Sequence, residues 1–413
     1  MTFELALCDK LPLLGTASLA GRLLLLALLM GTTAVAQPAT DALQLHRRAL
    51  VFDAHCDTLL RVVRSGYQLG ERHSEHHIDL PRLQQGGIDV QGFALWVDPR
   101  KEDPPPARQA LDLLAAFEDQ LQKNADRMAL VRTAAEARRV VAEGKIGALL
   151  AIEGGYAIEN DITRLSWFYD RGVRYMTLVW MQAHDWADSS DDEPRWGGLN
   201  DLGRSVVREM NRLGMMIDLS HASDETVRDV LAISEDPVIL THSCSRTLCN
   251  IPRNVSDETL KAVAERGGVV GVNYYIGYLV DSYAQARKAR QEQRRRREQE
   301  LRDPYGAESE RFREERKRLG ENYDRQDEAY PGGDTDYRVI VDHIDHMVKV
   351  AGMDHVGLGS DFDGVSRLPA GLNDAADVPK ITQELLARGY SESDIRKILG
   401  ENFMRVFAQV CGE

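Results

Sequence analysis

The chain has 413 residues, of which 43% are hydrophobic and 28% charged, and its formal net charge is −14 at pH 7. This composition is typical of a globular protein, and the negative charge excludes a broad nucleic-acid-binding face, which needs basic side chains to neutralise phosphate. The length is compatible with one α/β barrel, a fold that commonly exceeds about 250 residues in a single domain.

The amino-terminal residues have the pattern of a secretory signal peptide. Arg22 precedes an apolar run over residues 23–30, and Ala34-Val35-Ala36 forms an A-x-A cleavage site. We therefore predict a signal peptide over 1–36, cleaved after Ala36, and a secreted or periplasmic chain over 37–413 that forms a single domain. The run is shorter than the roughly 20 apolar residues that span a bilayer. We expect no stable membrane insertion after cleavage; an uncleaved anchor is the alternative.

Eight apolar runs alternate with amphipathic segments after the signal peptide. The runs cover residues 50–55, 90–97, 146–153, 175–180, 215–221, 238–242, 269–275 and 355–361. Helical patterns cover residues 107–123, 134–143, 202–213, 224–231 and 256–266. Ser223-Asp224 and Ser256-Asp257 are capping signals that predict the starts of the last two. Near-continuous apolar strands between helices are typical of a parallel sheet buried on both faces. Eight of them favour a closed (β/α)8 TIM-like barrel over an open doubly wound sheet, since no glycine-rich dinucleotide fingerprint follows a strand.

A charged stretch at about residues 281–330 does not fit a minimal barrel. It lies between the seventh and eighth predicted strands, is rich in acids and bases, and has few apolar residues. We expect a solvated, partly helical insertion. Because loops after barrel strands lie over the active-site mouth, a lid or a dimer contact is the alternative to an excursion without function. Helical patterns at 378–388 and 393–407 should complete the outer ring.

Candidate metal ligands stand where the apolar runs end. In a barrel the carboxyl ends of the strands converge on one face, and imidazoles and carboxylates gathered there would be unstable without cations. Two metal ions at such a site can share a water, lower its pKa and polarise a carbonyl, which suits hydrolysis of an amide or ester. A carboxylate such as Glu153 can bridge them. The residues concerned are His55, Asp57, Glu153, His221, His242, Asp361 and Asp363.

Each histidine taken singly is more often a structural residue, and the prediction of a metal site depends on all of them together.

The cysteines after the signal peptide show no C-x-x-C pairing. Export permits disulfides, but their connectivity cannot be read from spacing, and we expect small buried residues rather than further ligands. These cysteines are Cys56, Cys244, Cys249 and Cys411.

Several long segments in a fixed order resemble the membrane dipeptidase family (renal dipeptidase-like, metallopeptidase family M19) of the amidohydrolase superfamily. The segments are DAHCDTLL, HIDLPRLQQGGIDVQGFALWV, LLAIEGG, NRLGMMIDLSHASD, VILTHSCSR with PRNVSD, and VGLGSDFDGV. The resemblance covers about residues 49–407 apart from the charged insertion. It implies a (β/α)8 barrel, a binuclear zinc centre, a dipeptide substrate and a homodimer.

The resemblance also implies roles for individual residues. One zinc would be held by His55, Asp57 and Glu153, and the other by Glu153, His221 and His242. Arg253 would bind the substrate carboxylate, and Asp361 would transfer a proton near the water and the substrate amine. Asp363 is a further substrate-site candidate, and Asp188 is expected to cap a loop.

The sequence departs from the family at one informative place. Many members carry a histidine after the fourth strand that is thought to polarise the scissile carbonyl, but this chain has Trp180 there. Losing one such donor can cost on the order of 10²–10³ in rate. His184, four residues later, is hypothesised to enter the site from the loop. Tyr156 likewise replaces the histidine often found after the bridging glutamate.

These observations lead to one main hypothesis and two alternatives. The main hypothesis is an exported zinc dipeptidase that cleaves the peptide bond with a metal-activated water. The first alternative is an amidohydrolase that acts on a β-lactam, a lactone or another small amide. The second is a non-catalytic binding protein that kept the metal pocket, which the Trp180 replacement motivates.

Overall fold

The computed structural model describes residues 41–101, 103–305, 309–324 and 330–413. Residues 42–413 form one compact unit. The predicted signal peptide and its cleavage after Ala36 lie outside the described residues, so they stay predictions, as does the single-domain boundary at residue 37. Among the described helices, none combines the length and the apolar character that crossing a membrane requires.

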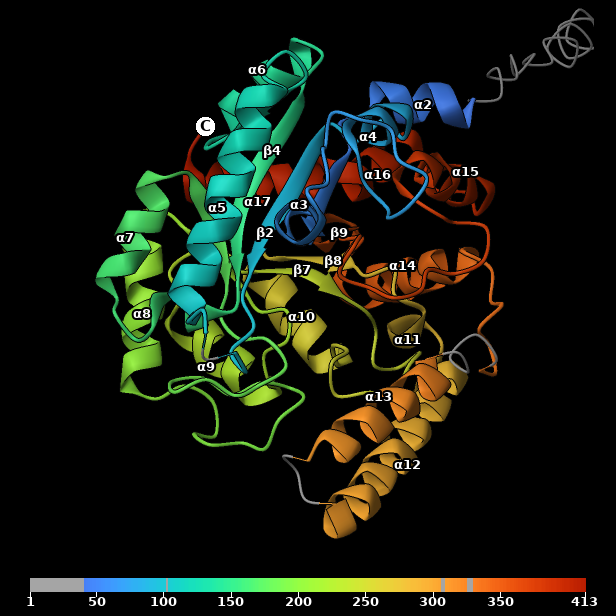
Figure 1. Ribbon diagram of the computed structural model, residues 1–413. Helices are drawn as coiled ribbons and strands as arrows, with labels where there is room; N and C mark the ends of the chain where they lie inside the picture. Colours follow the sequence, from blue (N-terminus) through green and yellow to red (C-terminus); the bar gives the residue numbers. More distant parts are fainter. Residues whose placement is uncertain (1–40, 102, 306–308, 325–329) are drawn as a thin grey trace, which may run out of the picture. The chain divides into compact units, whose positions relative to one another are not determined.

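Parallel strands form a closed barrel with helices around it (Figure 1). β1 is hydrogen-bonded to β2 on one side and to β9 on the other, and β2 pairs directly with β4, which completes the ring. This confirms the predicted (β/α)8 TIM-like barrel. The barrel strands are β1 (Phe52–Cys56), β2 (Val90–Trp96), β4 (Ile146–Glu153), β5 (Val173–Thr177), β6 (Met216–Asp218), β7 (Ile239–Ser243), β8 (Val269–Val272) and β9 (Val356–Leu358).

One strand was not predicted from the sequence. β3 (Met128–Leu130) pairs in parallel with the first residues of β4, from Met128 beside Ile146 to Leu130 beside Ala148. Further along, β4 pairs with β5 instead. Three residues are too few to show a period of two, so β3 forms because the edge of β4 is available there, which only the tertiary structure provides.

Several strands end earlier than the sequence suggested, and the chain turns sharply after them. β6 ends at Asp218 and β9 at Leu358, so His221 and Asp361 lie in turns. Both residues have positive φ angles, 70° for His221 and 59° for Asp361. This left-handed conformation costs a non-glycine residue on the order of 1 kcal/mol. The neighbouring pairing of β1 with β2 also shifts register between Asp53 and Cys56, a bulge that redirects the side chains around His55.

The predicted helices form the outer ring with the expected caps, apart from the pattern at 393–407, whose last residues lie in a helix at the end of the barrel. Ser223 accepts a hydrogen bond from the backbone N–H of Thr226, and Ser256 accepts one from Thr259, at the first turns of their helices. The helices include α3 (Leu59–Ser65), α5 (Pro106–Lys123), α6 (Ala134–Ala142), α8 (Asp201–Leu213), α9 (Asp224–Ile233), α10 (Asp257–Glu265), α14 (Arg338–Ala351) and α15 (Pro379–Ala387).

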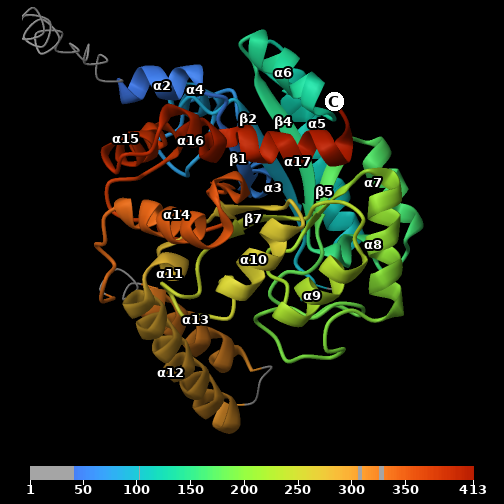
Figure 2. The same cartoon turned by 180° about the vertical axis from the view of Figure 1, so that it is seen from behind.

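The last helix closes the amino-terminal end of the barrel. α17 (Asn402–Cys411) runs across the strands (Figure 2). Its apolar residues share one buried cluster with the first residues of β1, β2, β7 and β8. Phe403 lies against Phe52, with ring centroids 5.5 Å apart. This end of the barrel is therefore an apolar plug.

The charged insertion is a helical hairpin between β8 and β9. α12 (Asp281–Tyr305) and α13 (Glu310–Asp324) pack against each other (Figures 1 and 2). α12 begins directly after the short α11 (Ile276–Leu279), and Tyr283 in its first turn is buried against Tyr330. The prediction of a partly helical insertion is confirmed, and its base is anchored beside the barrel mouth.

Candidate metal centre

The five predicted metal ligands lie together at the carboxyl ends of the strands. His55 is in β1, Glu153 is the last residue of β4, and His242 is in β7. Asp57 follows β1, and His221 lies in the turn after β6. All five side chains are buried. Residues almost 190 positions apart in the sequence thus share one small volume, because parallel strands align their carboxyl ends.

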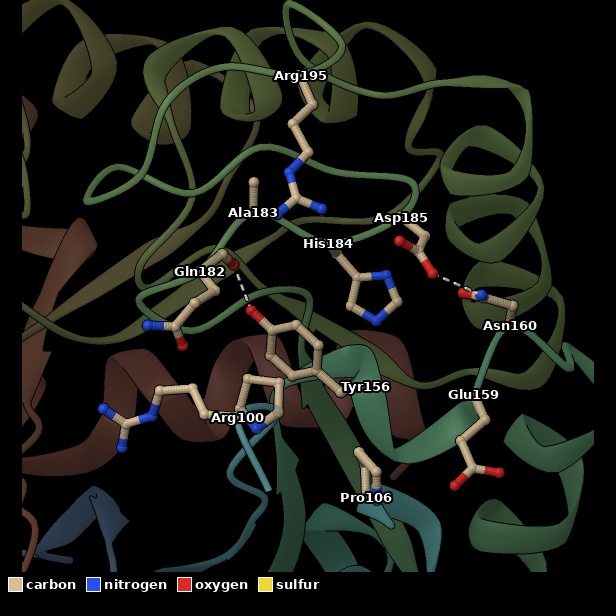
Figure 3. A pocket seen from close by; sticks show the side chains of 11 residues that line it. Arg100, Pro106, Tyr156, Glu159, Asn160, Gln182, Ala183, His184, Asp185 and Arg195 are labelled. Carbon is tan, nitrogen blue, oxygen red and sulfur yellow. Dashed lines mark hydrogen bonds between the residues drawn. The ribbon is translucent and has the colours of Figure 1, made fainter. Parts of the chain in front are cut away.

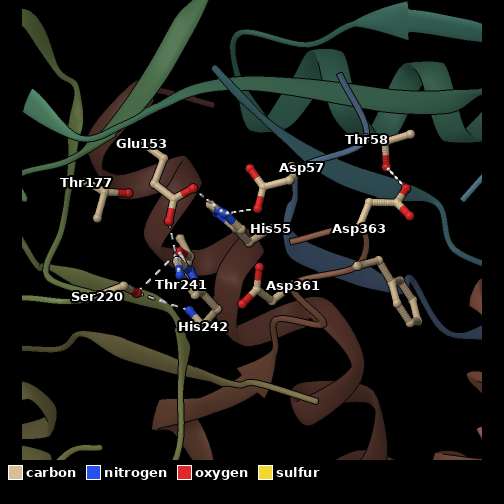
Figure 4. Close-up of polar contacts among 12 residues, drawn as sticks. His55, Asp57, Thr58, Glu153, Thr177, Ser220, Thr241, His242, Asp361 and Asp363 are labelled. Carbon is tan, nitrogen blue, oxygen red and sulfur yellow. Dashed lines mark hydrogen bonds and ion pairs between the residues drawn. The ribbon is translucent and has the colours of Figure 1, made fainter. Parts of the chain in front are cut away.

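The two carboxylate oxygens of Glu153 face different groups of ligands. Oε2 lies 3.3 Å from His55 Nε2, and Asp57 Oδ2 lies 3.8 Å from the same nitrogen. Oε1 lies 3.2 Å from His221 Nε2 and 3.5 Å from His242 Nε2. Within each group the donor atoms are within 4.8 Å of one another. Figure 4 shows Glu153 between His55 and His242. One oxygen is thus available to each of two cations.

Hydrogen bonds at the far ring nitrogens orient two of the histidines. Tyr175 donates its hydroxyl proton to the Ala54 carbonyl (2.8 Å), so its oxygen accepts from His55 Nδ1 at 3.1 Å. Thr241 donates its hydroxyl proton to the Asp218 carboxylate at 2.7 Å, so its oxygen accepts from His242 Nδ1 at 2.8 Å. In both rings Nδ1 carries a proton, so Nε2 is the nitrogen left to bind a cation. That is the tautomer that a metal ligand needs.

Burial and charge compete strongly in this cluster. Burial opposes ionisation of Glu153, but the charge of His55 and hydrogen bonds from the histidines outweigh it and hold the pKa of Glu153 well below its usual value. Burial would lower the pKa of His55, yet the carboxylates of Glu153 and Asp57 raise it to about 10. Burial and the Glu153 charge raise the pKa of Asp57 well above its usual value. The carboxylates therefore require nearby positive charge.

The residues present fit a pair of divalent cations. The donors are imidazole nitrogens and carboxylate oxygens, the set that Zn²⁺ takes. Asp57 Oδ1 is buried and has no hydrogen-bond partner among the described residues, so it is available as a further donor. Buried polar atoms rarely stay unpaired without a reason.

Asp218 is a fourth buried carboxylate near the cluster, but its oxygens are already used. Oδ1 accepts from the backbone N–H groups of Ser220 and Thr241, both at 2.9 Å. Oδ2 accepts from the hydroxyls of Thr177 (2.6 Å) and Thr241 (2.7 Å). Although Asp218 groups geometrically with His55 and His242, we assign it to orienting His242 through Thr241.

Sequence reasoning missed the residues that orient the ligands. A usable signal was Asp218 inside the apolar run 215–221, because a carboxylate within a buried strand must be hydrogen-bonded. Thr241 directly precedes His242 and resembled an ordinary β-branched strand residue. Tyr175 carried no signal, since its hydroxyl meets His55 only after the barrel closes.

Asp361 lies beside the cluster, as predicted. Its Oδ2 accepts a hydrogen bond from Asn273 Nδ2 at 2.8 Å. Burial raises the pKa of Asp361 to about 6, although the charge of His55 works in the opposite direction. A carboxyl group with a pKa near neutrality is suited to taking up and releasing a proton. Asn273, in the turn after β8, is a further residue that the sequence did not single out.

Arg253 places a buried cation next to the second group of ligands. Its terminal nitrogens donate to Ser243 Oγ (2.9 Å) and to the His242 carbonyl (2.7 Å). Its Nε is buried without a hydrogen-bond partner among the described residues. The guanidinium carbon lies 5.3 Å from the ring centre of Tyr278.

A cavity of about 340 Å³ opens over the cluster, and Trp180 forms part of its wall. The Trp180 ring meets the edge of Trp96 at a centroid distance of 4.9 Å and lies 6.4 Å from the ring of His221. The position where the resemblance expects a hydrogen-bonding histidine is thus occupied by an aromatic wall. The volume suits a small ligand.

His184 does not line this cavity. It lines a separate cavity of about 410 Å³, together with Tyr156 (Figure 3). The ring centre of His184 lies 4.6 Å from that of Tyr156 and 4.4 Å from that of Trp186. Burial lowers the pKa of His184 to about 4. The hypothesis that His184 takes the place of the missing histidine finds no support in this position, because the loop after Trp180 carries the ring into the neighbouring cavity.

Two other predicted residues have mainly structural contacts. Asp363 lines the metal cavity, but its carboxylate accepts from Thr58 Oγ1 (2.6 Å) and from the His77 backbone N–H (2.9 Å). These bonds join two loops and leave less capacity for the predicted substrate contact. Asp188 accepts from the backbone N–H groups of Arg195 and Gly198, the loop-capping role expected of it.

The cysteines of the described chain are buried and form no disulfide.

A known protein family and solved structures match nearly the whole chain. The family model described as membrane dipeptidase (peptidase family M19) matches residues 39–412. The chain is similar to the probable dipeptidase PvdM from Pseudomonas aeruginosa, with 26% identity and a TM-score of 0.77 over 89% of this chain and 97% of that one.

Two further solved structures are similar over nearly the same span. One is the dipeptidase AC, a metallopeptidase of family M19, with 27% identity and a TM-score of 0.71 over 88% of this chain and 99% of that one. The other is a metallopeptidase from Rhodobacter sphaeroides liganded with a phosphinate mimic of the dipeptide L-Ala-D-Ala, with 26% identity and a TM-score of 0.70 over 88% and 99%.

Proposed function

The chain belongs to the membrane dipeptidase family, peptidase family M19, and is a metallo-dipeptidase; from this premise we propose that it holds two zinc ions bridged by Glu153 and hydrolyses dipeptides at that centre. The observation that carries the proposal is the division of the Glu153 oxygens, with Oε2 facing His55 and Oε1 facing His221 and His242. A single-metal site would not need a carboxylate placed between two sets of ligands.

Two zinc ions bound there would supply a water of lowered pKa and polarise the scissile carbonyl. The protein contributes binding, orientation and proton transfer. Arg253 anchors the free carboxylate of the dipeptide, because a buried guanidinium with an unused Nε favours an anionic partner. Trp180 and Trp96 form an apolar wall that limits the size of the ligand and excludes water.

Asp361 acts as the proton carrier. It accepts a proton from the attacking water and donates that proton to the amine nitrogen as the peptide C–N bond breaks. Its pKa of about 6 lets both forms be populated near neutral pH. The hydrogen bond from Asn273 holds one carboxylate oxygen in place, so that the other oxygen faces the reacting groups.

Metal analysis combined with a hydrolysis screen tests the proposal. We expect two zinc ions per chain by mass spectrometry of the metals, turnover of L-Ala-L-Ala or L-Ala-D-Ala, loss of that turnover with chelator, and recovery when zinc is returned. Turnover of a lactone or β-lactam but of no dipeptide would favour the amidohydrolase alternative. Dipeptide binding without turnover of any substrate by the fully metallated protein would favour a binding protein.

Export and dimerisation are part of the same proposal. The apolar run 23–30 followed by Ala34-Val35-Ala36 supports export and cleavage after Ala36, and amino-terminal sequencing of the protein from the extracytoplasmic fraction tests it. A mature chain that begins upstream of Gln37 would contradict cleavage there. Light scattering of the purified protein tests the homodimer, and a monomeric mass at micromolar concentration would contradict it.

A further inference from the structure

Three arginines line the metal cavity without a carboxylate partner among the described residues. They are Arg61 and Arg64 of α3 and Arg287 of α12. Arg61 donates only to the Asp363 backbone carbonyl (3.2 Å), and its Nε is buried without a hydrogen-bond partner. We call these three residues the arginine rim. The chain as a whole has a net charge of −14, so a basic overall composition does not explain the rim.

Two of these arginines lie over aromatic rings of the cavity wall. The guanidinium carbon of Arg64 is 5.9 Å from the ring centre of Trp96, and that of Arg287 is 5.5 Å from the ring centre of Tyr275. Stacking of this kind orients a guanidinium and leaves its N–H groups available at the edge. Arg100, which lies over the ring of Trp180, shows the contrast, since it is paired with Asp98 at 2.8 Å.

Arg287 is connected through two tyrosine rings to Arg253, the residue proposed to bind the substrate carboxylate. Tyr275 meets Tyr278 edge-to-face with ring centroids 4.9 Å apart, and the guanidinium of Arg253 lies over Tyr278 at 5.3 Å. Two tyrosines in edge-to-face contact therefore lie between the buried Arg253 and Arg287 at the cavity. A ligand whose terminal carboxylate occupied Arg253 would need a second anionic group to reach the arginine rim.

The acids in and near the cavity do not account for the rim. Asp57, Glu153 and Asp361 are matched by the cations proposed at the metal centre, and the carboxylate of Asp363 is used by Thr58 and His77. Asp191 lies close enough for its charge to act on His221 and Tyr278. Within the described residues it forms no ion pair with the arginine rim.

We propose that the arginine rim binds an anionic side chain of the substrate, so that the enzyme prefers dipeptides that carry a side-chain carboxylate, and that the charged insertion contributes to this preference through Arg287. The inference rests on the proposed dipeptidase function and names its substrate class. Guanidinium groups at the mouth of a cleft recognise carboxylates through charge-assisted hydrogen bonds. The insertion is then a specificity element rather than a solvated excursion.

Substrate pairs that differ only in charge test this inference. The values of kcat/KM are compared for L-Glu-L-Ala against L-Gln-L-Ala and for L-Ala-L-Glu against L-Ala-L-Gln, with the zinc-loaded full chain. We expect the glutamate member of at least one pair to be preferred by about tenfold, the size of one charge-assisted hydrogen bond. Equal values, or a preference for glutamine, in both pairs would overturn the inference.

Two arginine variants show whether the insertion takes part. Arg287→Gln should reduce the Glu-to-Gln ratio to about twofold or less. Arg297→Gln, on the same helix but paired with Glu300 and exposed, removes the same charge away from the cavity and should leave the ratio unchanged. A ratio that stays the same in Arg287→Gln, or falls equally in both variants, would contradict a contact from Arg287.

Binding measurements separate this inference from the proposed function. If the zinc-loaded protein cleaves none of the dipeptides, calorimetry gives their dissociation constants directly. Tighter binding of a glutamate dipeptide than of its glutamine counterpart, lost in Arg287→Gln, would support the arginine rim while hydrolysis fails. Equal binding of all members would overturn the rim whatever the outcome of the hydrolysis assay.

Discussion

The two ends of the barrel use the same strands for opposite purposes. At the amino-terminal end, apolar first residues of the strands pack against α17, with Phe403 on Phe52. At the carboxyl-terminal end, histidines and carboxylates crowd around Glu153, and several of them sit in turns with positive φ. One end contributes stability by burying apolar surface. The other end uses part of that stability to hold polar groups where chemistry needs them.

The largest expected effect is at the carboxyl-terminal end. His221→Ala should lower kcat/KM by about 10³-fold or more and reduce zinc content, because one ligand of the proposed second zinc ion is lost. Stability should change little, since Ala keeps the left-handed backbone at this position and its cost. Kinetics and metal analysis check this, with circular dichroism as the control for folding. Retained activity with full zinc content would remove His221 from the metal site.

A substitution at the amino-terminal end should instead lower stability and leave activity nearly unchanged. Phe403→Ala should cost about 3–5 kcal/mol of unfolding free energy through lost burial and a cavity, while kcat/KM of the remaining folded protein stays within about twofold. Urea unfolding checks the predicted loss of stability and steady-state kinetics check the retained activity, with Phe403→Leu as a milder control. A large loss of zinc affinity in Phe403→Ala would show that the ends are not independent.

Between the two ends, His343 of α14 should make stability depend on pH. Its Nδ1 accepts from the Ser245 backbone N–H and its Nε2–H donates to the Leu279 carbonyl, both at 3.0 Å. Burial lowers the pKa of His343 to about 4, below the value near 6.5 expected when unfolded. The unfolded state therefore takes up the proton first as pH falls.

The contribution of His343 is fully present above pH 6.5 and should be lost progressively towards pH 4, by on the order of 3 kcal/mol. Unfolding midpoints measured across this range for wild type and His343→Gln check it, because other titrating groups act equally in both. Parallel curves for the two proteins would contradict the prediction.

A smaller loss of zinc affinity is expected when a residue that orients a ligand, rather than the ligand itself, is replaced. Thr241→Val removes the oxygen that accepts from His242 Nδ1 and should weaken zinc binding by about 10–100-fold. Thr177→Val is the matched control, because Thr177 also donates to Asp218 but has no hydrogen bond to a histidine ring among the described residues. Competition with a zinc chelator measures both. Equal weakening would mean that Asp218, and not the Thr241–His242 contact, sets the affinity.

The smallest effect is expected at His184. Because His184 lines the neighbouring cavity, beside the rings of Tyr156 and Trp186, His184→Phe should change kcat/KM by less than about threefold. The same kinetic assay decides it. A loss of about 10²-fold or more would revive the hypothesis that His184 replaces the carbonyl-polarising histidine.

Much of this protein could be predicted from residue patterns alone. Eight apolar runs predicted the barrel, and serines before helical patterns predicted the caps at Ser223 and Ser256. Ligand candidates such as His55 and Glu153 were identified because they end apolar runs, and parallel strands bring such positions together. These features depend on periodicity and on the chemistry of side chains, which are written in the sequence.

What only the tertiary structure decided are contacts between distant segments. The sequence could not show that Asp218 reaches His242 through Thr241 or that the loop after Trp180 carries His184 away from the proposed metal centre. Nor could it show that Arg287 of the insertion lines the cavity over that centre. Each depends on where a turn directs a side chain. Local propensities leave such directions open, whereas the packing of the closed barrel selects one of them.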